Sequence, residues 1–163
     1  MKLAIVPGSF DPMTLGHLEL VKKALKRYDE VVVAVMINPS KRYLFDMDTR
    51  VEIAKRTVSD YPNVRVIAER GMLINLYDRL GASAVCKGWR NESDYFYELR
   101  MADWNREHNS RFRTEMIYAY GDMAEISSTK VRESLANGIS PEDMIHPLAM
   151  PLVIGKLVEK GEV

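Results

Sequence analysis

The sequence predicts an α/β fold, namely a single doubly wound, five-stranded parallel sheet of the Rossmann-like kind. Three observations predict it. Runs of β-branched and other apolar residues alternate along the chain with amphipathic runs of helical length. The strand-like runs are apolar throughout, which is typical of strands buried on both faces of a parallel sheet. The length of 163 residues suits one domain, so we expect a single domain over residues 1–163 with right-handed crossovers.

The first half of the chain is expected to supply three strands and two helices. In the first helix Leu18, Val21 and Leu25 recur at helical spacing. The second helix begins after Asp46 or Asp48, either of which can cap it, and a turn ends it. The predicted elements are a strand over Leu3–Val6, a helix over Leu15–Leu25, a strand over Val31–Ile37, a helix containing Val51 to Val58, and a strand over Val64–Ile67.

The second half is expected to add two strands and several helices. Gly81 ends a short helix, because glycine readily adopts the left-handed conformation found at helix C-termini. The longest helix is polar and needs only one apolar stripe, formed by Tyr95, Leu99 and Ala102, against the sheet. The predicted elements are a helix over Met72–Leu80, a strand over Ala84–Lys87, a helix over Asp94–Asn109, a strand over Met116–Tyr120, a helix over Ser128–Ala136, and helices near Pro141 and Pro151.

The composition argues against several classes of function. Lys and Arg total 23, as do Asp and Glu, so no overall field favours nucleic acid or an anionic membrane. No apolar stretch approaches the roughly 20 residues that span a bilayer. The single Cys86 cannot form a disulfide within the chain, and with three scattered histidines it offers no zinc-ligand spacing. We therefore expect a buried Cys86, a cytoplasmic protein, no resident metal, and neither nucleic acid nor a membrane as partner.

The junction between the first strand and the first helix is typical of a phosphate site. Gly8 permits close approach of the backbone, Ser9 offers a hydroxyl, and Thr14 can cap the helix. His17 lies in the first turn, where free N–H groups and the helix dipole favour an anion. A lone histidine at such a position is more often structural, so the functional interpretation depends on the whole segment from Gly8 to His17.

The ends of the other predicted strands carry cations and hydroxyls. Lys41 follows the second strand, Lys87 and Arg90 lie at the end of the fourth, and Ser127–Thr129 opens the helix after the fifth. Taken singly, the cations are better explained as solvated loop charges, and the hydroxyl run is equally consistent with a plain helix cap. Because the carboxyl ends of parallel strands meet at one edge of the sheet, together they predict a site for phosphorylated ligands.

Four segments, in this order and over nearly the whole chain, resemble the phosphopantetheine adenylyltransferase family of the nucleotidylyltransferase superfamily. They are Gly8–His17, whose end Thr14–His17 is similar to the HxGH hallmark, Pro39–Lys41, Gly88–Arg90 with Asp94 and Tyr97–Glu98 beyond it, and Ile126–Thr129. The resemblance implies transfer of AMP from ATP to 4'-phosphopantetheine, which yields dephospho-coenzyme A and pyrophosphate. It also implies a homohexamer, and by analogy with phosphoryl-transfer sites we expect Mg²⁺ to arrive with ATP.

The resemblance implies roles for individual residues as well. The catalytic candidates are His17 and Lys41, suited to the α-phosphate, and Arg90, suited to the leaving pyrophosphate. A phosphate monoester is already an anionic nucleophile, so the reaction needs no general base. The candidate ATP-binding residues are Ser9, Phe10, His17, Gly88, Trp89, Arg90, Glu98, Met123, Ala124, Glu125, Ile126, Ser127, Ser128 and Thr129. The candidate acceptor-binding residues are Ser9, Lys41, Leu73, Asn75 and Lys87.

Three positions depart from the residues that are usual in the family. Ser9 stands where threonine is usual, Lys87 where arginine is usual, and Met123 near an expected aromatic residue. Lysine lacks the planar, two-pronged donor geometry of arginine. Two alternatives therefore stay open: a nucleotidylyltransferase acting on another phosphomonoester, such as nicotinamide mononucleotide, and a non-catalytic nucleotide-binding module. Size and charge balance disfavour a fragment of an aminoacyl-tRNA synthetase.

Overall fold

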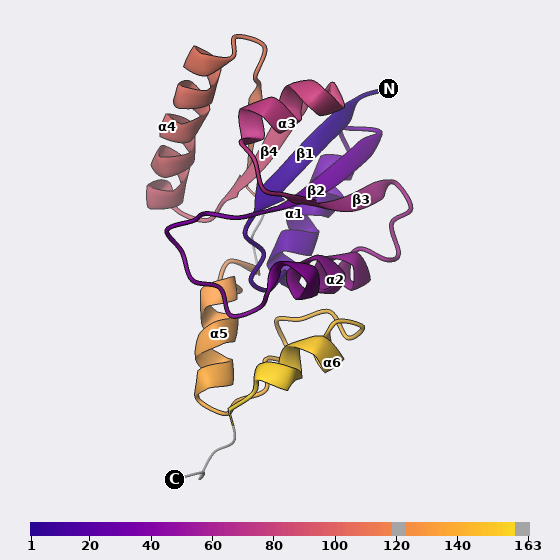
Figure 1. Cartoon of the computed structure of the whole chain (residues 1–163), viewed down its shortest axis with the longest axis vertical. Coiled ribbons are helices and arrows are strands. Elements are labelled where there is room, and N and C mark those ends of the chain that lie inside the picture. Colours follow the sequence, from indigo (N-terminus) through magenta and orange to yellow (C-terminus); the bar gives the residue numbers. More distant parts are fainter. Residues whose placement is uncertain (119–122, 159–163) are drawn as a thin grey trace.

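Five parallel strands form the centre of the computed structural model, which describes residues 1–118 and 123–158. All neighbouring strands pair in parallel, in the order β3-β2-β1-β4-β5, so the predicted doubly wound sheet is confirmed (Figure 1). The strands are β1 (Leu3–Gly8), β2 (Glu30–Met36), β3 (Val64–Glu69), β4 (Ala84–Trp89) and β5 (Thr114–Tyr118). The helices are α1 (Leu15–Leu25), α2 (Met47–Thr57), α3 (Leu73–Leu80), α4 (Glu92–His108), α5 (Ser128–Ala136) and α6 (Met150–Val153), followed by a 3₁₀ turn, η2 (Ile154–Lys156).

Alternate side chains of the central strands feed two apolar cores, one on each face of the sheet. In β1, Ala4 and Val6 pack on the face covered by α1, α2, α5 and α6, whereas Leu3 and Ile5 pack on the opposite face with α3. Cys86 belongs to the first of these cores and is fully buried, as expected. Burial and the nearby Glu115 raise the pKa of its thiol to about 12, so this cysteine remains an uncharged packing residue.

The order of the strands reverses beside β1. The chain moves outward from β1 to β2 and β3, and then returns through α3 to place β4 on the other side of β1. The loops that leave the carboxyl ends of β1 and β4 therefore run in opposite directions and open a crevice between them. Residues 9–14 and 90–91, which connect these strands to α1 and α4, border that crevice.

Several elements differ from the sequence-based prediction. Strand β5 begins at Thr114, two residues before the predicted start, and the predicted end at Tyr120 lies outside the described residues. Turns, not a helix, follow Pro141. The expected stripe on α4 is also wrong at Leu99, which is 38% exposed, because the helix turns Glu98 and Asn105 toward the sheet together with the predicted Ala102.

The residues that begin and end individual helices were predicted more accurately. Asp46, not Asp48, caps α2 by accepting a hydrogen bond from the Thr49 N–H at 2.8 Å. Gly81 ends α3 with a φ of 62°, the left-handed conformation that the sequence predicted. Within the described parts of the chain, none of the helices combines the length and apolarity that crossing a bilayer requires.

Candidate active site

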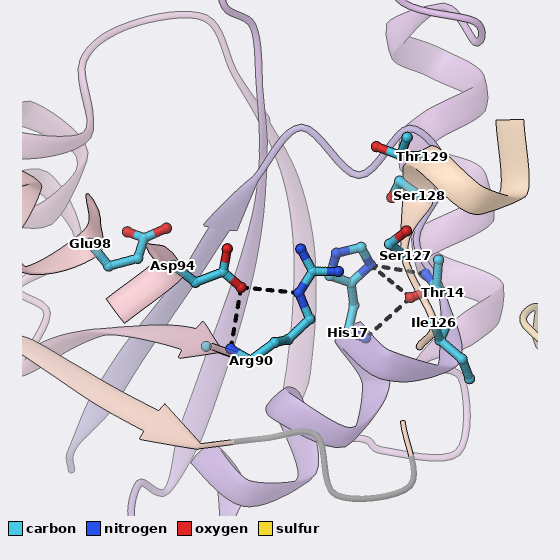
Figure 2. Close-up of a pocket in the computed structure, with 10 residues that line it drawn as sticks. Thr14, His17, Arg90, Asp94, Glu98, Ile126, Ser127, Ser128 and Thr129 are labelled. Atoms are coloured by element: carbon cyan, nitrogen blue, oxygen red, sulfur yellow. Dashed lines mark hydrogen bonds and ion pairs between the residues drawn. The ribbon is translucent and has the colours of Figure 1, made fainter. Parts of the chain in front are cut away.

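A polar cavity at the carboxyl edge of the sheet lies between the starts of α1, α4 and α5, with a volume of about 270 Å³ (Figure 2). In Figure 2 the guanidinium of Arg90 points toward the His17 ring, with Asp94 and Glu98 on one side and the start of α5 on the other. The residues that line the cavity are Thr14, His17, Gly88, Arg90, Asp94, Glu98, Ile126, Ser127, Ser128 and Thr129. The structure thus brings together three of the four segments that the sequence singled out.

A second cavity, of about 180 Å³, adjoins the first at the end of β1. His17, Gly88 and Glu98 line both cavities. The residues that complete the second one include Gly8, Ser9, Phe10, Cys86 and Lys87. A ligand in either cavity would therefore meet His17, and two ligands could meet there end to end.

A third, smaller cavity of about 100 Å³ extends away from this junction along α4. Its lining includes apolar and amide side chains: Leu73, Tyr97, Met101, Ala102 and Asn105. Lys87 connects it to the second cavity, and Glu98 lines all three. Lys87 Nζ lies 3.4 Å from Glu98 Oε1, so the cation at the junction has a carboxylate beside it.

The His17 ring is held in one orientation by the N-terminal cap of α1. The Thr14 side chain accepts a hydrogen bond from the His17 N–H, and the Thr14 N–H donates to His17 Nδ1 at 3.0 Å. This is a capping box in which a histidine replaces the usual acidic residue. Because Nδ1 accepts, the proton of the neutral ring lies on Nε2, which is free to donate to a ligand.

The charge state of His17 follows from its surroundings. Burial, together with the positive charges of Arg90 and Lys87, lowers its pKa to about 4. The ring is therefore neutral at physiological pH and acts as a hydrogen-bond donor without carrying a charge. The cationic charge at the site comes from Arg90 and Lys87 instead.

This low pKa predicts that stability depends on pH. Between about pH 6.5 and 4 the unfolded state binds a proton at His17 that the folded state does not, so stability is fully present above this window and falls as the pH drops through it. The loss in the free energy of unfolding should reach at most about 3 kcal/mol.

Chemical denaturation of the wild type and His17→Asn across this pH range measures the loss, since the variant lacks the titrating ring. His108→Asn, at an exposed position on α4, is the control and should retain the wild-type fall. Parallel curves for wild type and His17→Asn would contradict the prediction.

Arg90 is oriented by the first turn of α4. Its Nε donates to Asp94 Oδ2 at 3.0 Å, and its backbone N–H donates to the same oxygen at 3.2 Å. Asn91 caps the helix by accepting from the Asp94 N–H at 2.9 Å, which places the carboxylate beside Arg90. The remaining guanidinium nitrogens are left to face the cavity (Figure 2).

The three hydroxyl side chains at the start of α5 have different roles: some are used in structural hydrogen bonds, and one can donate to a ligand. Ser127 caps the helix, accepting from the Lys130 N–H at 3.1 Å. The Ser128 hydroxyl donates to the Pro12 carbonyl at 2.7 Å and so joins α5 to the loop before α1. The Thr129 hydroxyl accepts from Arg132 Nη2 at 3.2 Å, which leaves its own proton available to the cavity. The run of hydroxyls is therefore both a cap and part of the cavity wall.

Some predicted site residues do not reach these cavities. Lys41 is exposed in the segment between β2 and α2, and Asn75 lines a separate cavity with Asp78 and His108. Trp89 packs against Tyr95 and Tyr118. Outside the walls of the three cavities are also Met123, Ala124 and the exposed Glu125.

Gly8 also has a packing role that the sequence did not indicate. A Cβ at this position would lie 3.1 Å from the ring of Phe10, so the missing side chain makes room for Phe10 at the wall of the second cavity. Phe10 has a φ of 47°, is 4% exposed, and packs edge-on to the His17 ring at 5.0 Å. The glycine thus supports the aromatic wall against which His17 rests.

Sequence reasoning missed several lining residues of the third cavity. Met101 and Asn105 belong to α4, and Thr114 begins β5. Asn105 alone had a signal in the sequence, since Glu98, Ala102 and Asn105 recur at helical intervals on one face. Among the described residues, no group of three or more His, Cys, Asp or Glu side chains is arranged to hold a metal ion.

Comparison with known proteins agrees with this geometry. The family described as cytidylyltransferase-like matches residues 5–134. A phosphopantetheine adenylyltransferase of Heliobacterium modesticaldum is 38% identical over 98% of this chain and 93% of its own length. Another of that name, from Clostridium botulinum strain 657, is 35% identical over 99% of both chains. The chain belongs to the phosphopantetheine adenylyltransferase family.

The same fold is also found in a protein of low sequence identity. A solved structure of a Vibrio parahaemolyticus protein that is named as a nicotinate-nucleotide adenylyltransferase superposes with a TM-score of 0.69, at 17% identity, over 94% of this chain and 99% of the other. At that identity the likeness shows the fold. Within the phosphopantetheine adenylyltransferase family, this member carries Ser9 and Lys87 on the walls of its second cavity.

Proposed function

We propose that this protein transfers AMP from ATP to 4'-phosphopantetheine, giving dephospho-coenzyme A and pyrophosphate. Membership of the family supports the reaction, since the relatives match over nearly their whole length. One structural observation carries the proposal furthest: His17, Gly88 and Glu98 line both the larger cavity and the cavity at the end of β1. A nucleotide in the first and an acceptor phosphate in the second would meet at His17.

The reaction needs positioning and charge stabilisation more than proton transfer. An oxygen of the acceptor's phosphate attacks the α-phosphorus of ATP, a new P–O bond forms, and the bond to the β-phosphate oxygen breaks to release pyrophosphate. The acceptor is already anionic, so no proton must be removed. His17 Nε2–H donates to the α-phosphoryl oxygen as its charge grows, and it needs no reorganisation because Thr14 fixes the ring.

The donor phosphates fit the wall formed by Arg90 and α5. Arg90 presents guanidinium nitrogens to the larger cavity, and the first turn of α5 adds backbone N–H groups and the Thr129 hydroxyl. These groups are suited to the β- and γ-phosphates, which carry the charge of the leaving pyrophosphate. Mg²⁺ would enter bound to the triphosphate, and the cavity wall offers the carboxylates of Asp94 and Glu98 and the hydroxyls of α5 as oxygen ligands for it.

The acceptor fits the second and third cavities. Ser9 and Lys87 offer a hydroxyl and an ammonium group to its phosphate. Beyond Lys87, the walls of Leu73, Met101 and Asn105 suit an arm that alternates methylene and amide groups. Large exposed apolar side chains on α4, such as Phe96 and Trp104, are consistent with the homohexamer that we propose, and the cytoplasm is its proposed location.

Pyrophosphate release tests the proposal and separates it from the alternatives. The protein is incubated with ATP, Mg²⁺ and one of 4'-phosphopantetheine, pantetheine or nicotinamide mononucleotide. Release should require 4'-phosphopantetheine, and pantetheine, which lacks the phosphate nucleophile, is the matched control. Release with nicotinamide mononucleotide alone would reassign the acceptor. Nucleotide binding without release under any condition would identify a non-catalytic binding module.

A pair of substitutions tests the assignment of the triphosphate. Thr129 is a sharper probe than Ser128, whose hydroxyl already donates to Pro12. Thr129→Val and Arg90→Ala should each raise the KM for ATP by roughly tenfold, the scale of one hydrogen bond to a charged group. Because both would hold the same leaving group, the double variant should lose less in kcat/KM than the product of the two single losses.

The control for this pair is Ser134→Ala in the last turn of the same helix, which should leave the KM for ATP unchanged. AMP binding should weaken little in either single variant, because only the triphosphate reaches the start of α5. Independent losses, or equal weakening of ATP and AMP, would place Thr129 and Arg90 in separate sites.

A further inference from the structure

A buried arginine joins the two loops that carry Ser9 and Lys41. Arg50, in the first turn of α2, is 1% exposed. Its Nη1 donates to the Ser9 carbonyl at 2.8 Å and to the Met36 carbonyl at 3.1 Å, and its Nε donates to the Phe45 carbonyl at 3.2 Å. One guanidinium group therefore connects the end of β2, the loop after β1 and the residue before the cap of α2.

Tyr43 extends this connection to the turn that contains Lys41. The Arg50 guanidinium carbon lies 4.0 Å from the centre of the Tyr43 ring. The Tyr43 hydroxyl accepts a hydrogen bond from the Asn38 N–H at 2.6 Å, and the Asn38 carbonyl accepts from the Lys41 N–H at 3.0 Å. The turn at 38–41 is thus held through Tyr43, although Lys41 itself is exposed.

Asp11 ties the same two loops together at a second point. Its carboxylate, in a residue only 3% exposed, accepts from the Leu44 N–H at 2.8 Å and the Phe45 N–H at 2.9 Å. Arg132 of α5 donates to the Asp11 carbonyl at 2.7 Å. The segment 43–45 is therefore held by Arg50 and by Asp11. The turn at 38–41, in contrast, is joined to these residues through Tyr43.

We propose that Arg50 and Tyr43 are positioning residues for the transfer reaction, which hold the Lys41 turn in a fixed place relative to the Ser9 loop. The inference rests on the proposed function, because it gives Lys41 a part in that reaction. A lysine side chain is long and flexible, and it is harder to place when the backbone that carries it also moves. An ordered turn therefore lowers the conformational entropy that is lost when the Lys41 ammonium is placed at the α-phosphate. Arginine suits position 50 because its planar fork directs donors from two separate nitrogens to three carbonyls at once.

A purely structural role for these residues predicts a different pattern. In that case a substitution lowers the melting temperature, and any loss of activity is the same whether or not Lys41 is present. A positioning role predicts a loss that acts through Lys41 and disappears with it. Tyr43→Phe distinguishes the two, because it keeps the ring over Arg50 and removes only the hydroxyl that holds Asn38.

The first readout is turnover in a double-mutant cycle. Tyr43→Phe should lower kcat by about tenfold in the wild-type background, since small misplacements of a reacting group cost this much or more. In the Lys41→Met background the same change should have no further effect on kcat. Tyr61→Phe, in the turn after α2, is the matched control and should change kcat in neither background. Equal losses in both backgrounds, or no loss in the wild type, would overturn the positioning role.

The second readout does not depend on activity. Hydrogen exchange of the Asn38 and Lys41 amides should become at least about tenfold faster in Tyr43→Phe, while amides inside α2, such as that of Ala54, keep their wild-type rates. Unchanged exchange at 38 and 41 would overturn the inference even in an active protein. Faster exchange in a protein that releases no pyrophosphate would retain the role of Tyr43 in the turn and reject the proposed reaction instead.

Discussion

Replacing His17 by alanine should lower kcat by about 10²–10³-fold or more, the scale of losing one preorganised donor to a developing charge. The KM for ATP should change much less, because the Nε2–H bond strengthens chiefly in the transition state. The structure gives the reason in detail: the Thr14 N–H occupies Nδ1, and the low pKa keeps the ring neutral with its proton on Nε2.

Steady-state pyrophosphate release at saturating ATP measures this effect. His108→Ala, at an exposed position near the end of α4, is the matched control and should retain wild-type kcat. A melting temperature close to that of the wild type would show that His17→Ala still folds. A folded His17→Ala with nearly normal turnover would remove His17 from the mechanism.

Lys41→Met should lower kcat by roughly 10²-fold, because it removes a positive charge that the transition state needs while preserving most of the side-chain length. The melting temperature should stay close to that of the wild type, since Lys41 is exposed and lies outside the three cavities and both apolar cores described above. Arg42→Met is the matched control, because Arg42 is the next residue, is equally exposed, and has no assigned part in the reaction.

Lys41 lies outside the three cavities, so its contribution requires the side chain to reach inward when substrates bind. A Lys41→Met variant with wild-type kcat would contradict this part of the mechanism. So would an equal loss in Arg42→Met, because it would indicate a general effect of positive charge on the loop.

Features set by neighbouring residues were predictable from the sequence. Thr14 lies directly before an amphipathic run and does cap α1, and Gly81 ends α3 as its conformational freedom suggests. The buried strands follow from uniformly apolar runs. Capping preferences do not identify the cap where several suitable residues are adjacent. Of the three hydroxyl residues at the start of α5, Ser127 is the cap, and only the three-dimensional path of the chain determines which of them it is.

Features set by distant partners were not predictable. Arg50 is a charged residue on a helix, and local rules assign such residues to the surface. Arg50 is buried because carbonyl groups 14 and 41 residues away in the sequence accept hydrogen bonds from it. The hydrophobic periodicity of the sequence does not indicate such distant contacts. The face of α4 shows the same limit, since Glu98 turns inward to meet Lys87 while the apolar Leu99 stays exposed.

The position of Glu98 on the walls of all three cavities has a consequence for inhibition. Two fragments that bind on either side of this residue, one resembling a nucleotide and one a pantetheine arm, need only a short linker to become one molecule. Joining them makes the second contact intramolecular, at an effective concentration in the millimolar range for a short flexible linker. Two weak ligands could thus yield one tight inhibitor without any new contact. The increase in affinity on linking them would indicate how close together the two cavities lie.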